Sequence, residues 1–105
     1  MRDKTKDYKK ADIIITKTCE VFGLPEQQLK QDRREALFIN TRSAIYYFLR
    51  DKTYLTYPEI AKIFMKDHAT IINGVDRAYN KLRHDLDYSE KILILEEELK
   101  AFNHG

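Results

Sequence analysis

Lys66-Asp67-His68-Ala69-Thr70-Ile71-Ile72-Asn73-Gly74 is the most informative segment of the sequence, because its spacing predicts an amphipathic helix that opens on short polar side chains. Asp67 suits the N-cap position, where its carboxylate can accept a hydrogen bond from a free backbone N–H. Apolar residues then recur at helical spacing and form the expected buried stripe: Ile71, Val75, Ala78 and Leu82. His68, Ala69 and Thr70 are left at the exposed helix start, where small polar groups can reach base edges.

A second, shorter helix is predicted just before this one. Thr56 and Glu59 have the spacing of a capping box, in which each side chain satisfies a backbone N–H at the helix start. Pro58 lies in the same first turn, where its missing N–H is harmless. Two helices joined by a short turn are the layout of a helix-turn-helix, whose second helix enters the major groove. The pattern therefore favours binding to duplex DNA.

The rest of the chain is predicted to be helical as well. A first helix begins at Ala11 and ends at Gly23, a residue suited to a left-handed C-terminal position. A short helix follows from Pro25 to Lys30, and a longer one covers residues 38–53. The last helix carries the stripe Tyr88, Ile92, Leu95, Leu99 and Phe102. The expected fold is all-α, a single small helical domain of about six helices over residues 11–105. Residues 1–10 are expected to be a mobile basic tail, with a fraying helix start as the alternative.

Composition fits one domain and excludes several classes of protein. A chain of 105 residues with 43% hydrophobic residues can build one core. The net charge of +2 is unevenly spread, because residues 1–10 and 62–84 each carry +3 whereas residues 85–105 carry −4. The single cysteine, Cys19, allows no internal disulfide and is expected to be a small buried hydrophobe. No apolar run is long enough for a signal peptide or a membrane span, so we expect a cytoplasmic protein without a membrane partner.

Three motifs, in matching order and spacing, resemble a known family. Arg33-Arg34 is followed after seven residues by Arg42-Ser43, where the family has a basic loop and a helix that begins with Arg-Gln. Thr56-Tyr57-Pro58-Glu59-Ile60-Ala61 matches its Ser-Leu-x-Glu-Ile-Gly helix, and Lys66-Asp67-His68-Ala69-Thr70-Ile71 matches its signature Arg-Asp-His-Thr-Thr-Val. From Ile14 to Phe102 the chain is similar to the C-terminal DNA-binding domain of the bacterial replication initiator DnaA, a Trp-repressor-like helix-turn-helix fold.

The resemblance implies a set of DNA contacts. In the family a basic-loop arginine enters the minor groove and the start of the signature helix reads the major groove, which here points to Arg34 and to residues 67–70. Neighbouring basic and polar residues would contact phosphates. The residues expected to bind DNA are Arg33, Arg34, Arg42, Ser43, Arg50, Lys62, Lys66, Asp67, His68, Ala69 and Thr70. The expected partner is double-stranded DNA, bound by a monomer, and other replication or regulatory proteins stay open as further partners.

Several positions depart from the family pattern. Met65-Lys66 stands where the family has Gly-Gly-Arg, so the turn is one residue shorter, and Ala69 and Ser43 replace a threonine and a glutamine. The preferred DNA sequence can therefore differ from the family's. The three glycines of the chain cannot form the Gly-x-x-x-x-Gly-Lys-Ser/Thr loop of the family's ATPase domain. We expect a module without ATPase activity that acts at origin-like boxes or as a regulator.

Other kinds of chemistry are less favoured by the sequence. Asp67 and His68 are adjacent in a helix and point about 100° apart, so they do not form a catalytic pair, and no enzyme is expected. His68, His84 and His104 lack ligand spacing, so we expect neither a metal nor a cofactor. Gly74 predicts a close approach to the other helix of the motif. The alternative function is a helical protein-interaction module that uses the DnaA-like scaffold and binds through its acidic last helix or an apolar surface.

Overall fold

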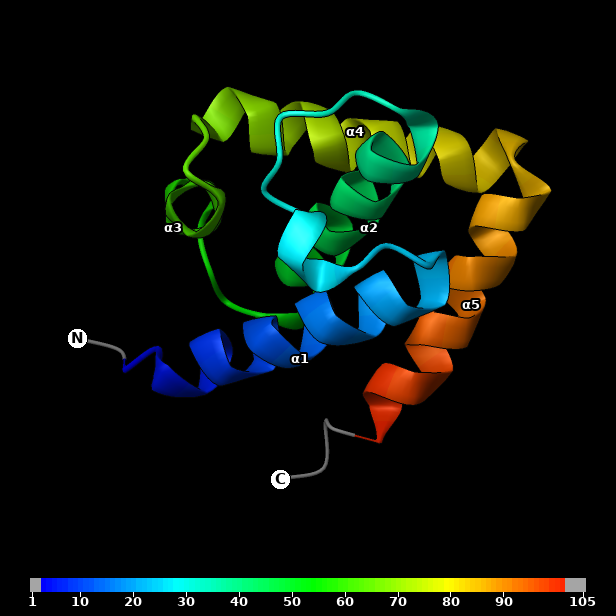
Figure 1. Cartoon of the computed structure of the whole chain (residues 1–105). Coiled ribbons are helices and arrows are strands. Elements are labelled where there is room, and N and C mark those ends of the chain that lie inside the picture. The colour runs from blue at the N-terminus through cyan, green and yellow to red at the C-terminus, as the bar shows by residue number, and fades with distance from the viewer. Residues whose placement is uncertain (1–2, 102–105) are drawn as a thin grey trace.

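Helices make up the regular structure between residues 3 and 101, the part of the chain that the computed structural model describes (Figure 1). In chain order they are α1 (Thr5–Phe22), the short 3-10 helix η1 (Glu26–Gln28), α2 (Ala36–Lys52), α3 (Tyr57–Phe64), α4 (His68–His84) and α5 (Leu86–Lys100). The all-α prediction is confirmed, with five α-helices and one 3-10 turn within these residues. Within residues 3–101, no helix is long and apolar enough to cross a membrane.

Helix α2 lies at the centre of the domain. It packs against α1, α3 and α4, and α5 packs against both α1 and α4. Figure 1 shows α4 crossing α2, with α3 beside the start of α4 and α5 leading away from its end. The predicted stripes of α4 and α5 are buried at Ile71, Val75, Ala78, Tyr88, Ile92, Leu95 and Leu99. Leu82 is partly buried, and Phe102 lies outside the described residues.

The helix ends follow the local signals in the sequence. Gly23 adopts a left-handed conformation with φ of 80° at the end of α1. The Thr56 hydroxyl accepts a bond from the N–H of Glu59, and the Glu59 carboxylate accepts one from the N–H of Thr56 at 2.8 Å, so the predicted capping box is present. The helix expected from Pro25 is only the single turn η1, and α2 begins at Ala36 rather than at residue 38.

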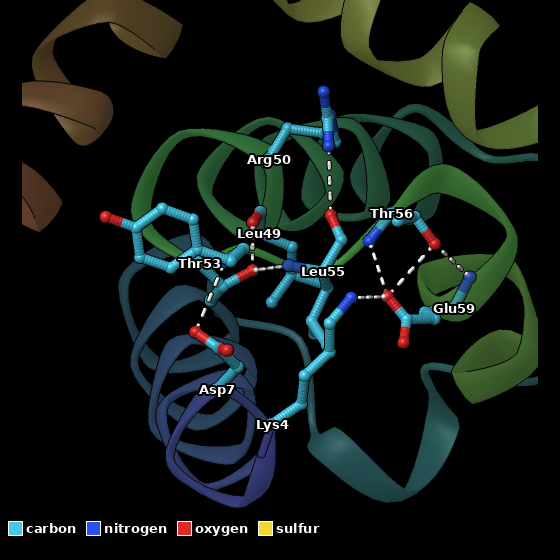
Figure 2. Close-up of polar contacts among 9 residues, drawn as sticks. Lys4, Asp7, Leu49, Arg50, Thr53, Leu55, Thr56 and Glu59 are labelled. Atoms are coloured by element: carbon cyan, nitrogen blue, oxygen red, sulfur yellow. Dashed lines mark hydrogen bonds and ion pairs between the residues drawn. The ribbon is translucent and has the colours of Figure 1, made fainter. Parts of the chain in front are cut away.

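The start of α1 differs from the predicted N-terminal tail, because α1 begins at Thr5 rather than at Ala11. The start of α1 is held against α3 and against the segment that precedes α3 (Figure 2). The Lys4 ammonium donates to Oε1 of Glu59 at 2.5 Å, and Oδ1 of Asp7 accepts a bond from the N–H of Tyr54 at 3.2 Å. These polar contacts anchor a turn in which few residues are apolar, so the apolar pattern alone placed the start of the helix too late.

Candidate nucleic-acid interface

The turn between α3 and α4 directs the second helix of the motif. Met65 ends α3 in the left-handed conformation with φ of 56°, and the N–H of Lys66 donates to the carbonyl of Ala61 at 3.0 Å. For a residue other than glycine this conformation costs about 1–2 kcal/mol. The side chain of Met65 is 83% exposed. The short turn therefore closes without a glycine and aims the start of α4 at solvent.

The start of α4 is an exposed polar surface. Oδ1 of Asp67 accepts bonds from both the N–H and the hydroxyl of Thr70, each at 2.9 Å, and these bonds lower the pKa of the Asp67 carboxyl. Asp67 is therefore the N-cap that the sequence predicted. His68 and Ala69 lie beside it and are exposed as well. Residues 67–70 thus form one accessible surface, in which the Asp67 carboxylate also has a structural role.

Arg42 organises the basic loop between η1 and α2. Its Nε donates to the carbonyl of Leu29 at 3.1 Å, its Nη1 donates to the carbonyl of Arg33 at 2.8 Å, and its Nη2 donates to the carbonyl of Gln31. The predicted phosphate contact would use this same guanidinium. Because much of its donor capacity is already committed to the loop backbone, the structure favours a positioning role for Arg42.

The two arginines of the loop have different surroundings. Arg33 pairs with Glu35, with Nε 2.9 Å from Oε1, and its guanidinium lies 4.7 Å from the ring centre of Phe38. Arg34 is exposed and forms no ion pair within residues 3–101. The neighbouring acidic residue Glu35 therefore neutralises Arg33, whereas the charge of Arg34 is available to a partner.

An open hollow of about 360 Å³ lies between the basic loop, α2 and α4. It brings Arg34 of the loop together with Lys66 and Thr70 at the start of α4, although Arg34 is more than thirty positions from both in the sequence. Asp32 is also part of the lining, so the hollow is not uniformly positive. Its cations are Arg33, Arg34, Arg42, Lys66 and Arg77.

Asn73 and Arg77 line the hollow, and sequence reasoning missed both. Thr70, Asn73 and Arg77 recur at spacings of three and four, so the helical period that predicted the buried stripe could also have identified this polar one. Gly74 lies on the same side of α4. A Cβ atom there would lie 2.4 Å from Cδ2 of Tyr46, so the close approach is to α2 and the predicted approach to α3 is wrong.

Three predicted DNA-binding residues are buried or lie outside the hollow. Ser43 adjoins the hollow but is 1% exposed, and its hydroxyl is 2.8 Å from the hydroxyl of Tyr88, so it offers a ligand almost no free surface. Arg50 lies outside the hollow, where its Nη1 donates to the carbonyl of Leu55 at 2.9 Å and its guanidinium is 4.2 Å from the ring centre of Tyr57. Lys62 is exposed on α3 and is not part of the lining.

Comparison with known proteins identifies similar sequences. The family model described as the bacterial DnaA protein helix-turn-helix matches residues 11–78. The chromosomal replication initiator protein DnaA of Mycoplasma pneumoniae is 27% identical over 73 residues, which cover 70% of this chain and 17% of that protein. The protein of the same name from Aliarcobacter butzleri is 29% identical over 101 residues, which cover 95% of this chain and 23% of that protein. The chain thus spans less than a quarter of the length of these relatives.

Proposed function

The chain belongs to the bacterial DnaA helix-turn-helix family, and from this membership we propose that it binds double-stranded DNA with sequence selectivity. One feature of the structure supports DNA binding independently of the family match. The basic loop and the start of α4 meet at one hollow, to which Arg34, Lys66 and Arg77 contribute cations from separate segments. Such a concentration of positive charge at a concave surface favours phosphate.

The hollow suits a strand of the sugar-phosphate backbone. A protein that reaches into one groove with a loop and into the next with a helix must let the intervening strand pass between them. In the proposal this strand crosses the hollow, Arg34 enters the minor groove and the start of α4 enters the major groove. Lys66 and Arg77 neutralise phosphates at the hollow, and Arg50 and Lys62 do so outside it.

Selectivity is assigned to the exposed start of α4. His68 can donate to or accept from a base edge, and the methyl group of Ala69 can contact thymine. The Thr70 hydroxyl donates to the Asp67 carboxylate, so both side chains present only hydrogen-bond acceptors to a base edge, in a fixed arrangement. Asn73 follows one turn later, and an amide side chain can pair with adenine.

The relatives are named as chromosomal replication initiators, which supports a role at origin-like boxes. The alternative role, as a regulator at other DNA boxes, relies on the same contacts to phosphates and bases. In this proposal the domain acts as a monomer, since one helix-turn-helix with one loop reads one asymmetric box. The residues of this chain supply DNA binding and no ATP hydrolysis, because the Gly-rich phosphate loop is absent from its sequence.

Selection of bound sequences from a random duplex pool tests the proposal. We expect enrichment of one short box, and the titration of that duplex should give a lower Kd than the titration of a scrambled duplex. His68→Ala should reduce the ratio of the Kd for the scrambled duplex to the Kd for the selected duplex about 10-fold, because a good base contact discriminates by about 1–3 kcal/mol. Lys100→Ala on α5 is the matched control and should leave the ratio unchanged. Failure to bind duplex DNA at low salt would refute the proposal, and binding without enrichment would refute selectivity.

A further inference from the structure

The outer face of α5 exposes large apolar side chains that the core does not use. Leu86 is 74% exposed, Leu93 is 65% exposed and Ile94 is 52% exposed. Leu86 and Leu93 lie two helical turns apart on the same side, and Ile94 adjoins Leu93. The opposite side of α5 is already buried against α1 and α4. Exposed apolar side chains that cluster on a helix are typical of a partner-binding surface when the other face of that helix is already packed against the core.

Carboxylates lie within this cluster. Glu90 is one helical turn from Leu86, Leu93 and Ile94, and Glu97 is one turn from Leu93 and Ile94. We call these five residues the outer α5 face. Glu97 forms an exposed ion pair with Lys100 at 3.2 Å, whereas Glu90 forms none among the residues that the structure describes. A partner that covers the leucines must therefore also cover negative charge.

The charge selects the kind of partner. A carboxylate that is removed from water needs a cation beside it, because burial without one is costly. DNA and anionic lipid are repelled by Glu90 and Glu97. A second copy of α5, laid across the same face, would bring the same carboxylates together. Lysine and arginine satisfy both requirements, since their apolar stems cover leucine while their charged ends reach a carboxylate.

We propose that the outer α5 face docks a basic amphipathic helix of another protein. Apolar side chains of that helix pack on Leu86, Leu93 and Ile94, and flanking lysine or arginine side chains pair with Glu90 and Glu97. The interaction is independent of DNA binding, because no residue of α5 lines the hollow between the basic loop and α4. The domain can then hold DNA and a protein at the same time on separate faces.

The test uses the full chain and two synthetic helical peptides of about 18 residues, long enough to cover α5. The first has leucines at helical spacing flanked by arginines, and the second has the same leucines flanked by glutamates. Fluorescence anisotropy should detect binding of the basic peptide and none of the acidic one. A Leu86→Ser/Leu93→Ser variant should raise the Kd of the basic peptide at least about 10-fold, from the loss of apolar burial. A Glu90→Gln/Glu97→Gln variant should raise it about threefold and weaken its dependence on salt.

Controls separate this surface from general effects. Tyr54→Ser removes an exposed aromatic side chain outside α5 and should leave the Kd of the peptide unchanged. All variants should unfold at the temperature of the parent and bind duplex DNA with its affinity. The proposal is overturned if the basic peptide does not bind, or if it binds the leucine variant as well as the parent. It is also overturned if the leucine change instead abolishes self-association of the chain or binding to phosphatidylglycerol vesicles.

Discussion

At the scale of single residues, Gly74 decides how closely α4 approaches α2. A Cβ atom at this position would meet Cδ2 of Tyr46 at 2.4 Å. The ring of Tyr46 cannot easily move away, because it is buried and packs edge-on against Phe64 with 5.1 Å between ring centres. Gly74→Ala should therefore destabilise the domain by about 1–3 kcal/mol, despite the helix propensity of alanine, which alone would stabilise it by about 1 kcal/mol. Urea unfolding measures the difference.

Two companion variants make the origin of this effect clear. Asn80→Ala lies on the exposed side of α4 and should not lower the stability. Adding Gly74→Ala to Tyr46→Ala should cost less than adding it to the parent, because the ring has been removed. Equal costs in the two backgrounds would contradict the steric explanation.

The guanidinium of Arg42 is expected to order the basic loop between η1 and α2. Its three bonds to loop carbonyls depend on the planar guanidinium, which lysine cannot reproduce. Arg42→Lys should increase amide hydrogen exchange in residues 30–34 without DNA and should weaken DNA binding roughly 10-fold, although the charge is kept. Arg77→Lys is the matched control, because a lysine still neutralises a phosphate. Unchanged exchange in Arg42→Lys would show that the guanidinium does not order the loop.

At the scale of helices, the sequence predicted what is encoded locally. The capping box at Thr56, the N-cap at Asp67 and the left-handed Gly23 were all predictable, because the signal and the structure lie within a few residues. The start of α1 was not, since it depends on Lys4 meeting Glu59 from across the domain. Nor could the motif match reveal that Ser43 is buried, because its partner Tyr88 is far away in the chain.

The contact between α1 and α3 predicts a dependence of stability on pH. Lys4 lies beside Glu59, and its ammonium, together with the N–H of Thr56, lowers the pKa of the Glu59 carboxyl from 4.5 to about 2 (Figure 2). A carboxyl group whose pKa is lowered by folding stabilises the folded state at pH values above its ordinary pKa. That contribution is lost as the pH falls from 4.5 towards 2.

Glu59→Gln isolates this charge, because glutamine still completes a capping box. Between about pH 6 and pH 2, the unfolding free energy of the parent should fall more steeply than that of Glu59→Gln. Glu97→Gln removes an exposed carboxylate and should follow the parent. Parallel curves for the parent and Glu59→Gln would mean that the ion pair with Lys4 does not stabilise the fold.

At the scale of the whole molecule, the small net charge is the sum of two surfaces of opposite charge. Cations gather at the hollow between the basic loop and α4, whereas α5 carries five carboxylates against two lysines. Net charge therefore says little about association with DNA, because no residue of the acidic helix lines the hollow. The affinity for DNA depends instead on how many cations at the hollow are free to displace counterions from phosphates.

The salt dependence of DNA binding measures that number. Each phosphate neutralised contributes about 0.9 to the slope of log K against log salt concentration. Arg34→Ala should reduce the slope by about 1, because Arg34 has no acidic partner within residues 3–101. Arg33→Ala, one residue away, should reduce it less, because Glu35 already pairs with that guanidinium at 2.9 Å. Equal reductions would show that the Arg33–Glu35 pair opens on DNA, and an unchanged slope in Arg34→Ala would remove Arg34 from the interface.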